Sequence, residues 1–185
     1  MAPPVRASTF IGTSLDGFIA RRDGSLDFLP AGGGEEHGYK EFFASVDALV
    51  IGRGTFETVL AFDEWPYGKK PVFVLSSRPL DLSGVRGGVV EQMDGQPAEI
   101  LSRLGARGFR HVYVDGGVTV QRFLRAGLIQ KLVVTRVPVL IGSGIPLFGP
   151  LEADIRLVHV ATRAYPSGLV SSEYEVEAAP QRAGN

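Results

Sequence analysis

The chain has 185 residues, enough for one domain with a substantial core and few for two. Its formal net charge of −1 leaves no basic surplus for nucleic-acid binding, and zero cysteines exclude disulfides, thiolate catalysis and cysteine metal sites. No apolar stretch reaches the roughly 20 residues of a membrane span, and the N-terminal residues lack the features of a signal peptide. We therefore expect a cytoplasmic protein without nucleic-acid or membrane partners.

Hydrophobic patterning predicts strands that alternate with helices. Strands are predicted at residues 6–11, 18–20, 48–51, 71–75, 89–90, 112–114, 132–137, 156–163 and 169–176. Helices are predicted at residues 35–45, 55–60, 97–104 and 118–126, the first of them after the glycines at 32–34. The last two strands form a hairpin through a turn at 165–168.

This order of elements predicts an α/β fold: a three-layer sandwich with a mostly parallel central sheet and an antiparallel C-terminal hairpin. We expect a single domain over residues 6–177. Residues 1–5 and 178–185 are expected to be flexible termini.

Two predicted strands end at glycines that open a helix. Leu49-Val50-Ile51 runs into Gly52-Arg53-Gly54-Thr55, and Val112-Tyr113-Val114 runs into Asp115-Gly116-Gly117. Such joints leave free backbone N–H groups and a positive helix end at the carboxyl edge of a sheet, where phosphates and dinucleotides bind. Glu57 stands where the Rossmann fingerprint has its third glycine, so that motif is absent. The joints predict one extended nucleotide cofactor, and tight strand–helix turns are the alternative.

A polar segment, Ser76-Ser77-Arg78, follows the apolar strand at 71–75 and lies where a crevice is expected in an open α/β sheet. Its two hydroxyls and its guanidinium could hold the phosphate of a ribose. Taken alone, an ordinary polar turn ahead of Pro79 is the favoured interpretation. Arg53 offers a second guanidinium in the first glycine turn.

Few other residues suggest catalysis. Asp16 lies in the turn after the first strand, where it either takes part in chemistry or fixes its own turn by bonding a backbone N–H. Glu36 lies at a predicted helix start, where negative charge complements the helix dipole. The histidines His37, His111 and His159 lack any i, i+4 partner, so no metal site is expected.

Five segments occur in an informative order: Ser14-Leu15-Asp16-Gly17, Val50-Ile51-Gly52-Arg53-Gly54-Thr55, Val74-Leu75-Ser76-Ser77-Arg78, Tyr113-Val114-Asp115-Gly116-Gly117 and Leu140-Ile141-Gly142-Ser143-Gly144-Ile145-Pro146-Leu147-Phe148. In this order and spacing the chain resembles the dihydrofolate reductase fold family. Within that family it is most similar to the C-terminal reductase domain of bifunctional riboflavin biosynthesis proteins. The chain has no cysteine for the zinc deaminase domain that often precedes such a reductase, so we interpret it as a stand-alone member.

The resemblance implies NADPH as the hydride donor. The cofactor phosphates would lie against Gly52, Arg53, Gly54 and Thr55, with Arg53 near the adenosine side. The adenine ribose and its 2′-phosphate would be lined by Ser76, Ser77 and Arg78. The pyrophosphate and nicotinamide half would meet Gly116, Gly117, Val118 and Thr119. The nicotinamide would be flanked by Thr13 and Ile19.

For the substrate, the resemblance makes Asp16 the first candidate for substrate contact or proton delivery and Glu36 the second. The implied enzyme is an NADPH-dependent oxidoreductase, similar to 5-amino-6-(5-phosphoribosylamino)uracil reductase, that acts on a small heterocyclic or ribosylated pyrimidine substrate. A true dihydrofolate reductase and a non-catalytic NADPH-binding dimer are the alternatives. The resemblance also implies a homodimer.

Overall fold

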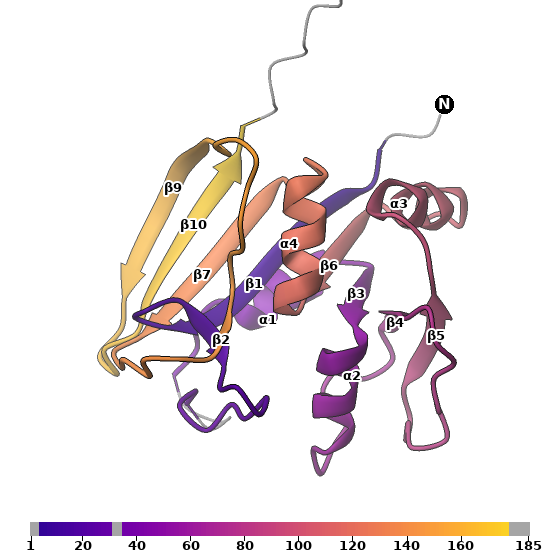
Figure 1. Cartoon of the computed structure of the whole chain (residues 1–185), viewed down its shortest axis with the longest axis horizontal. Coiled ribbons are helices and arrows are strands. Elements are labelled where there is room, and N and C mark those ends of the chain that lie inside the picture. The colour runs from indigo at the N-terminus through magenta and orange to yellow at the C-terminus, as the bar shows by residue number, and fades with distance from the viewer. Residues whose placement is uncertain (1–3, 31–34, 178–185) are drawn as a thin grey trace, which may run out of the picture.

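The computed structural model describes residues 4–30 and 35–177. Its strands are β1 (Arg6–Ser14), β2 (Phe18–Ala20), β3 (Ala48–Gly52), β4 (Pro71–Leu75), β5 (Val89–Met93), β6 (His111–Asp115), β7 (Lys131–Val137), β8 (Ile145–Pro146), β9 (Leu157–Ala164) and β10 (Val170–Val176). Its helices are α1 (Tyr39–Ser45), α2 (Arg53–Leu60), α3 (Pro97–Ala106) and α4 (Gly117–Arg125). An 8-stranded sheet has the order β5–β4–β3–β6–β1–β7–β10–β9, and β2 pairs with β8 in a separate two-stranded sheet (Figure 1).

The large sheet is parallel from β5 to β7 and ends in the antiparallel strands β10 and β9. Parallel neighbours need a crossover connection, and α2, α3 and α4 each lie between two parallel strands in the chain order. The hairpin of β9 and β10 turns at Gly168, whose φ of 86° favours glycine. The expected mostly parallel sheet with an antiparallel C-terminal hairpin is therefore confirmed.

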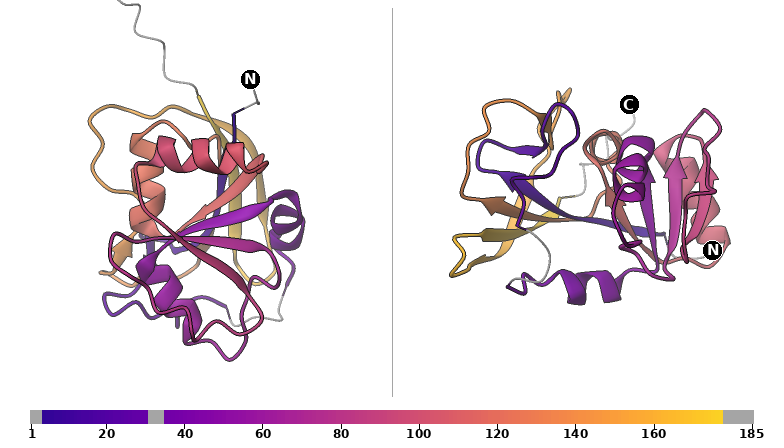
Figure 2. Two further views of the ribbon diagram at one scale, coloured as in Figure 1. Left: turned by 90° about the vertical axis from the view of Figure 1, so that its right-hand side faces the viewer. Right: turned by 90° about the horizontal axis from the view of Figure 1, so that it is seen from below.

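Helices cover both faces of the central strands. Because successive side chains of a strand point to opposite faces, neighbouring residues pack in different core clusters. Val50 and Val114 pack in the core cluster that includes residues of α3 and α4. Ile51 and Tyr113 pack in the cluster that includes residues of α1 and α2. The left view of Figure 2 shows α1 and α4 on opposite sides of the strands. Asp115 follows Tyr113 by two residues, so its side chain lies on the face of α1 and α2.

One predicted helix boundary is wrong. The helix expected from residue 35 begins only at Tyr39, because Gly38 precedes it with a φ of 82° and residues 35–38 are not helical. Glu36 therefore lies in the segment before α1 rather than in its first turn. The expected glycine break at 32–34 lies outside the described residues.

The other helices begin and end close to the predicted residues. The predicted start of α3 is confirmed: Pro97 stands in its first turn, and Gln96 and Glu99 form a capping box. The pairing of β2 with β8 was not predicted. It brings Ile19 and Ile145 to the start of α4, where an added Cβ at Gly117 would lie 3.0 Å from the Ile19 Cδ1 atom.

The ends of the described chain differ in their packing. Val5, which we expected in a flexible N-terminal segment, is 8% exposed and belongs to the core. Residues 1–3 and 178–185 lie outside the described part of the chain. Among the helices of the described part, none has the length and apolar character that crossing a membrane requires.

Candidate active site

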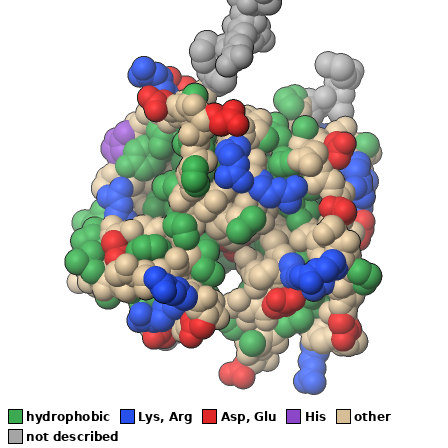
Figure 3. Space-filling model, in the orientation of Figure 1, with side chains coloured by type: hydrophobic (Ala, Val, Ile, Leu, Met, Phe, Trp, Pro, Cys, Tyr) green, Lys and Arg blue, Asp and Glu red, His purple; other side chains and the backbone are tan. Residues whose placement is uncertain are grey.

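A cleft of about 960 Å³ opens where β3 and β6 end and α2 and α4 begin. Figure 3 shows the surface hollowed between the segment that follows β2 and the region of α2. Nine of the predicted cofactor residues line this cleft: Ile19, Gly52, Arg53, Gly54, Thr55, Gly116, Gly117, Val118 and Thr119. The fold thus brings both glycine joints, which lie about 60 residues apart in the chain, to one site.

The two glycine joints interlock. An added Cβ at Gly52 would lie 2.7 Å from the Thr119 hydroxyl, and one at Gly116 would overlap the Thr55 hydroxyl. Gly116 also has a φ of 94°, which an L side chain rarely adopts. Each joint therefore needs glycine, because a threonine in the first turn of the opposite helix, Thr119 of α4 or Thr55 of α2, packs against its backbone.

Gly54 differs from these glycines. An added Cβ at Gly54 would meet no atom within 4 Å, so the packing of the protein does not require glycine there. Gly54 lies in the first turn of α2, where backbone N–H groups have no intrahelical partner. Open space beside free N–H groups suits a phosphate oxygen.

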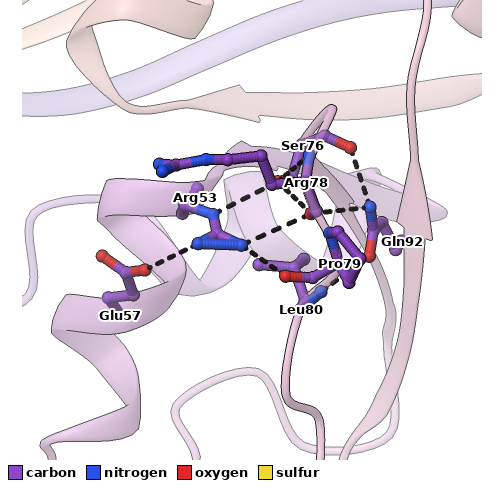
Figure 4. A network of polar contacts seen from close by, with 7 residues as sticks. All are labelled: Arg53, Glu57, Ser76, Arg78, Pro79, Leu80 and Gln92. Carbon is purple, nitrogen blue, oxygen red and sulfur yellow. Dashed lines mark hydrogen bonds and ion pairs between the residues drawn. The ribbon is translucent and has the colours of Figure 1, made fainter.

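Arg53 supports a loop instead of facing the cleft freely. Its guanidinium donates hydrogen bonds to the Ser76 hydroxyl at 3.2 Å, the Arg78 carbonyl at 3.3 Å and the Pro79 carbonyl at 2.6 Å (Figure 4). It also pairs with the Glu57 carboxylate at 3.6 Å. These contacts tie the start of α2 to the loop after β4, so the Arg53 guanidinium holds this loop in place and is not free.

Gln92 on β5 completes this support. Its amide nitrogen donates to the Ser76 carbonyl at 2.8 Å and the Arg78 carbonyl at 2.9 Å, while its amide oxygen accepts from the Leu80 N–H at 2.9 Å. Ser76, Ser77 and Arg78 lie at the β4 edge and do not line the cleft. Within the described chain the Arg78 guanidinium has no protein partner, and it extends from the loop past Arg53 (Figure 4).

Three other predicted residues lie outside the cleft. Thr13 is 2% exposed and packs within β1. The Asp16 carboxylate accepts hydrogen bonds from the Gly142 N–H at 2.7 Å and the Ile141 N–H at 3.3 Å. The Ser14 side chain, followed by these two N–H groups, lowers the pKa of Asp16. Glu36 is exposed and pairs with Lys40.

The contacts of Asp16 and Glu36 decide whether either acid is placed to donate a proton to a ligand in the cleft. Asp16 joins the turn after β1 to the loop after β7. A carboxyl with a lowered pKa is ionised at neutral pH and has no proton to donate. Glu36 lies on the surface before α1. The geometry therefore gives neither acid a place beside a ligand in the cleft.

Among the described residues, three acids line the cleft: Asp23, Glu57 and Asp115. Asp23 and Glu57 are exposed, whereas Asp115, at the end of β6, is half-buried. Burial raises its pKa to about 6, although its Oδ1 atom accepts a 2.8 Å hydrogen bond from the Gly116 N–H. Tyr39, Tyr67 and Tyr113 line the cleft beside it. Burial, reinforced by the Asp115 charge, raises the pKa of Tyr39 to about 12. A carboxyl whose pKa is raised toward neutral pH is suited to general acid catalysis, since a fraction of it still carries a proton there.

Asp115 belongs to the second glycine joint of the sequence, where no catalytic role is predicted for it. The signal was present, because an acid that directly follows a fully apolar strand and precedes two glycines ends in a cleft of an open sheet. The three tyrosines come from three separate segments of the chain, so no local sequence pattern predicts that they lie together in the cleft.

The fold and the cleft define an α/β protein of the dihydrofolate reductase type. The chain belongs to the family of the RibD C-terminal domain, whose sequence model matches residues 8–171. A Shewanella sp. PV-4 protein whose name connects it with riboflavin biosynthesis is 39% identical; the match covers 94% of this chain and 99% of that one, with a TM-score of 0.86.

Two more distant structures share the fold. The match to a Thermotoga maritima diaminohydroxyphosphoribosylaminopyrimidine deaminase/5-amino-6-(5-phosphoribosylamino)uracil reductase has a TM-score of 0.73 at 15% identity, covering 94% of this chain and 57% of that one. Dihydrofolate reductase from Enterococcus faecalis, in a complex with NADP(H), matches with a TM-score of 0.59 at 20% identity, covering 92% of this chain and 94% of that one. The expected resemblance and fold are confirmed, and the chain is a member of the riboflavin-type reductase family.

Proposed function

We propose that the protein is an NADPH-dependent oxidoreductase that reduces a small heterocyclic substrate. The interlocked glycine joints carry this proposal, because they present two helix starts to one cleft beside a carboxyl with a raised pKa. The family and the names of the Thermotoga and Enterococcus relatives support it.

The residues present fit the cofactor. Gly52, Gly54, Thr55 and Gly116 would hold the phosphates through backbone N–H groups and hydroxyls, and Arg78 would meet the 2′-phosphate. Bound NADPH supplies a hydride. Ile19 and the exposed Val118 would cover the reacting ring and exclude water. Asp115 would hold the proton that the reduced substrate needs.

The direct test is titration with NADPH and NADH, followed by cofactor fluorescence and thermal shift. We expect NADPH to bind and raise the melting temperature, since a ligand of the folded state stabilises it. Absence of binding at millimolar NADPH would refute the proposal. Equal affinity for NADH would refute the role of Arg78.

Arg78→Ala is expected to weaken NADPH binding by about 10- to 100-fold, because a hydrogen bond to a charged group contributes about 1.5–3 kcal/mol. NADH lacks the 2′-phosphate, so its dissociation constant should not change. Fluorescence titration of both cofactors measures the difference. Arg125→Ala, on the exposed end of α4, is the matched control and should leave both affinities unchanged.

Gly54→Ala separates binding from folding. Alanine favours a helix over glycine by about 1 kcal/mol, and the added methyl group meets no protein atom within 4 Å, so the melting temperature should rise. The same methyl group occupies the space proposed for a phosphate, so NADPH affinity should fall at least about tenfold, or 1.4 kcal/mol. Gly84→Ala, whose Cβ would meet Leu60 at 3.7 Å, is the control that should not change affinity. Unchanged NADPH affinity in Gly54→Ala would contradict the proposal that a phosphate of the cofactor lies beside Gly54.

We also propose that the protein is a homodimer that associates through β9. This edge strand is exposed along nearly its whole length, including Leu157 at 41%, Val158 at 47% and Val160 at 49%. A long apolar edge strand invites pairing with another chain. Sedimentation should give a dimer for the native protein and a monomer for Val160→Glu, whereas a native monomer would contradict the proposal.

A further inference from the structure

The floor of the cleft on the α1 and α2 face is aromatic. Phe10 and Tyr39 have ring centroids 5.5 Å apart, and Tyr39 and Tyr113 have ring centroids 6.5 Å apart. The Tyr113 hydroxyl donates a 2.7 Å hydrogen bond to the Phe10 carbonyl, which orients its ring. Tyr67, 6% exposed, also lines the cleft. We call Phe10, Tyr39, Tyr67, Tyr113 and Asp115 the aromatic floor.

The polar atoms of the aromatic floor favour N–H donors on a ligand. The Asp115 carboxylate accepts a hydrogen bond from the Gly116 N–H through Oδ1, and the Tyr113 hydroxyl beside it lowers its pKa. Its remaining acceptor capacity faces the cleft. Among the described residues, the Tyr39 and Tyr67 hydroxyls have no hydrogen-bond partner. An ionised carboxyl only accepts hydrogen bonds, and a tyrosine hydroxyl both donates and accepts. Ring walls of this kind stack on flat aromatic ligands.

The aromatic floor contains no cation. Among residues 4–30 and 35–177, the cations that line the cleft are Arg22, Arg53 and Arg122. Arg53 donates hydrogen bonds to the loop after β4, and Arg122 donates a 3.0 Å hydrogen bond to the Gly95 carbonyl. Arg22 is exposed beside Asp23 in the turn that follows β2.

A phosphate on the aromatic floor would therefore be left unpaired next to a carboxyl. Recognition of phosphate uses arginine, lysine or a helix start, and burying an anion without such a partner is costly. Like charges side by side also select against the wrong ligand. The helix starts of this cleft lie at the glycine joints, which the proposed cofactor occupies.

We propose that the aromatic floor binds a flat aromatic heterocycle that carries N–H donors and no phosphate. This inference rests on the proposed function, since it assumes that the cofactor fills the glycine-lined part of the cleft. It separates the substrate of this chain from the phosphoribosyl compound in the name of the Thermotoga relative.

Matched pairs of ligands that differ by one phosphate test the proposal: uridine and uridine 5′-phosphate, guanosine and guanosine 5′-phosphate, riboflavin and flavin mononucleotide. Calorimetric titration is made with the free protein and with protein saturated with NADP⁺. We expect at least one unphosphorylated member to bind at least about tenfold more tightly than its phosphate, a difference of about 1.4 kcal/mol. A phosphate that binds as tightly as its partner, or no binding by any unphosphorylated member at millimolar concentration, would overturn the inference.

A variant makes the test sharper. The Leu29 side chain lines the cleft and would lie 3.1 Å from a Cβ at Gly12, so Leu29→Arg places a cation beside the floor. It should raise the affinity for the phosphorylated members at least about tenfold. Leu140→Arg, at a position 69% exposed outside the cleft, should not. Failure of NADP⁺ to bind would refute the proposed function alone, because the comparison on the free protein still decides the ligand class.

Discussion

Asp115→Asn is expected to lower the turnover number at least about 100-fold, because general acid catalysis contributes roughly 10²–10⁴ in rate. Asparagine keeps the shape of the side chain and can accept the Gly116 N–H, but it supplies no proton. NADPH binding should stay within about twofold, so the loss falls on the chemical step. Single-turnover oxidation of NADPH, with the heterocycle that the native protein binds most tightly, measures the rate.

Asp94 offers a matched control for this substitution. Its carboxylate also accepts a 2.8 Å hydrogen bond from the N–H of the following glycine, Gly95, but it is exposed and outside the cleft. Asp94→Asn should therefore turn over at the native rate. The native rate should also fall about tenfold per pH unit above pH 6, as the Asp115 proton is lost. If the turnover rate of the native protein does not change between pH 5 and pH 8, Asp115 is not the general acid.

The same variant should be more stable than the native protein above pH 6. Burial raises the pKa of Asp115 from 3.8 to about 6, so the folded protein holds this proton more tightly than the unfolded chain does. Stability then falls as the pH rises from about 4 to about 6, and the ionised carboxyl costs about 3 kcal/mol above that range. Asparagine carries no charge and avoids this cost.

Urea unfolding across the pH range measures this effect. At pH 8 the free energy of unfolding should be about 2–3 kcal/mol higher for Asp115→Asn, and at pH 3.5 the two proteins should be equal. A domain of this size gains roughly 2–4 °C in melting temperature per kcal/mol. Asp94→Asn should show no such trend. A difference that is independent of pH would mean that packing, and not ionisation, separates the two proteins. A gain in stability with a loss of activity is typical of a strained functional group.

Much of the fold was predictable because its signals are local. The apolar run Leu49-Val50-Ile51 predicts a buried strand through β-branching and length, and Pro97 marks the start of α3 through its fixed φ. The helix before β3 was predicted too early, since nothing nearby in the sequence reveals that Gly38 adopts a positive φ. The pairing of β2 with β8 joins segments far apart in the chain, and two short strands carry too weak a pattern to predict it.

For the candidate site, the sequence by itself determined where backbone could approach a ligand: the glycine joints at residues 52–55 and 115–117, and the polar loop after β4. Only the tertiary structure decided what the side chains do. Arg53 supports a loop because the start of α2 lies next to that loop, and Asp16 holds a turn because the N–H groups of Ile141 and Gly142 meet it. Asp115 becomes the candidate acid because folding removes its carboxyl from water beside three tyrosines. Backbone geometry follows from neighbouring residues, whereas hydrogen-bond partners and desolvation depend on segments that meet only in the folded chain.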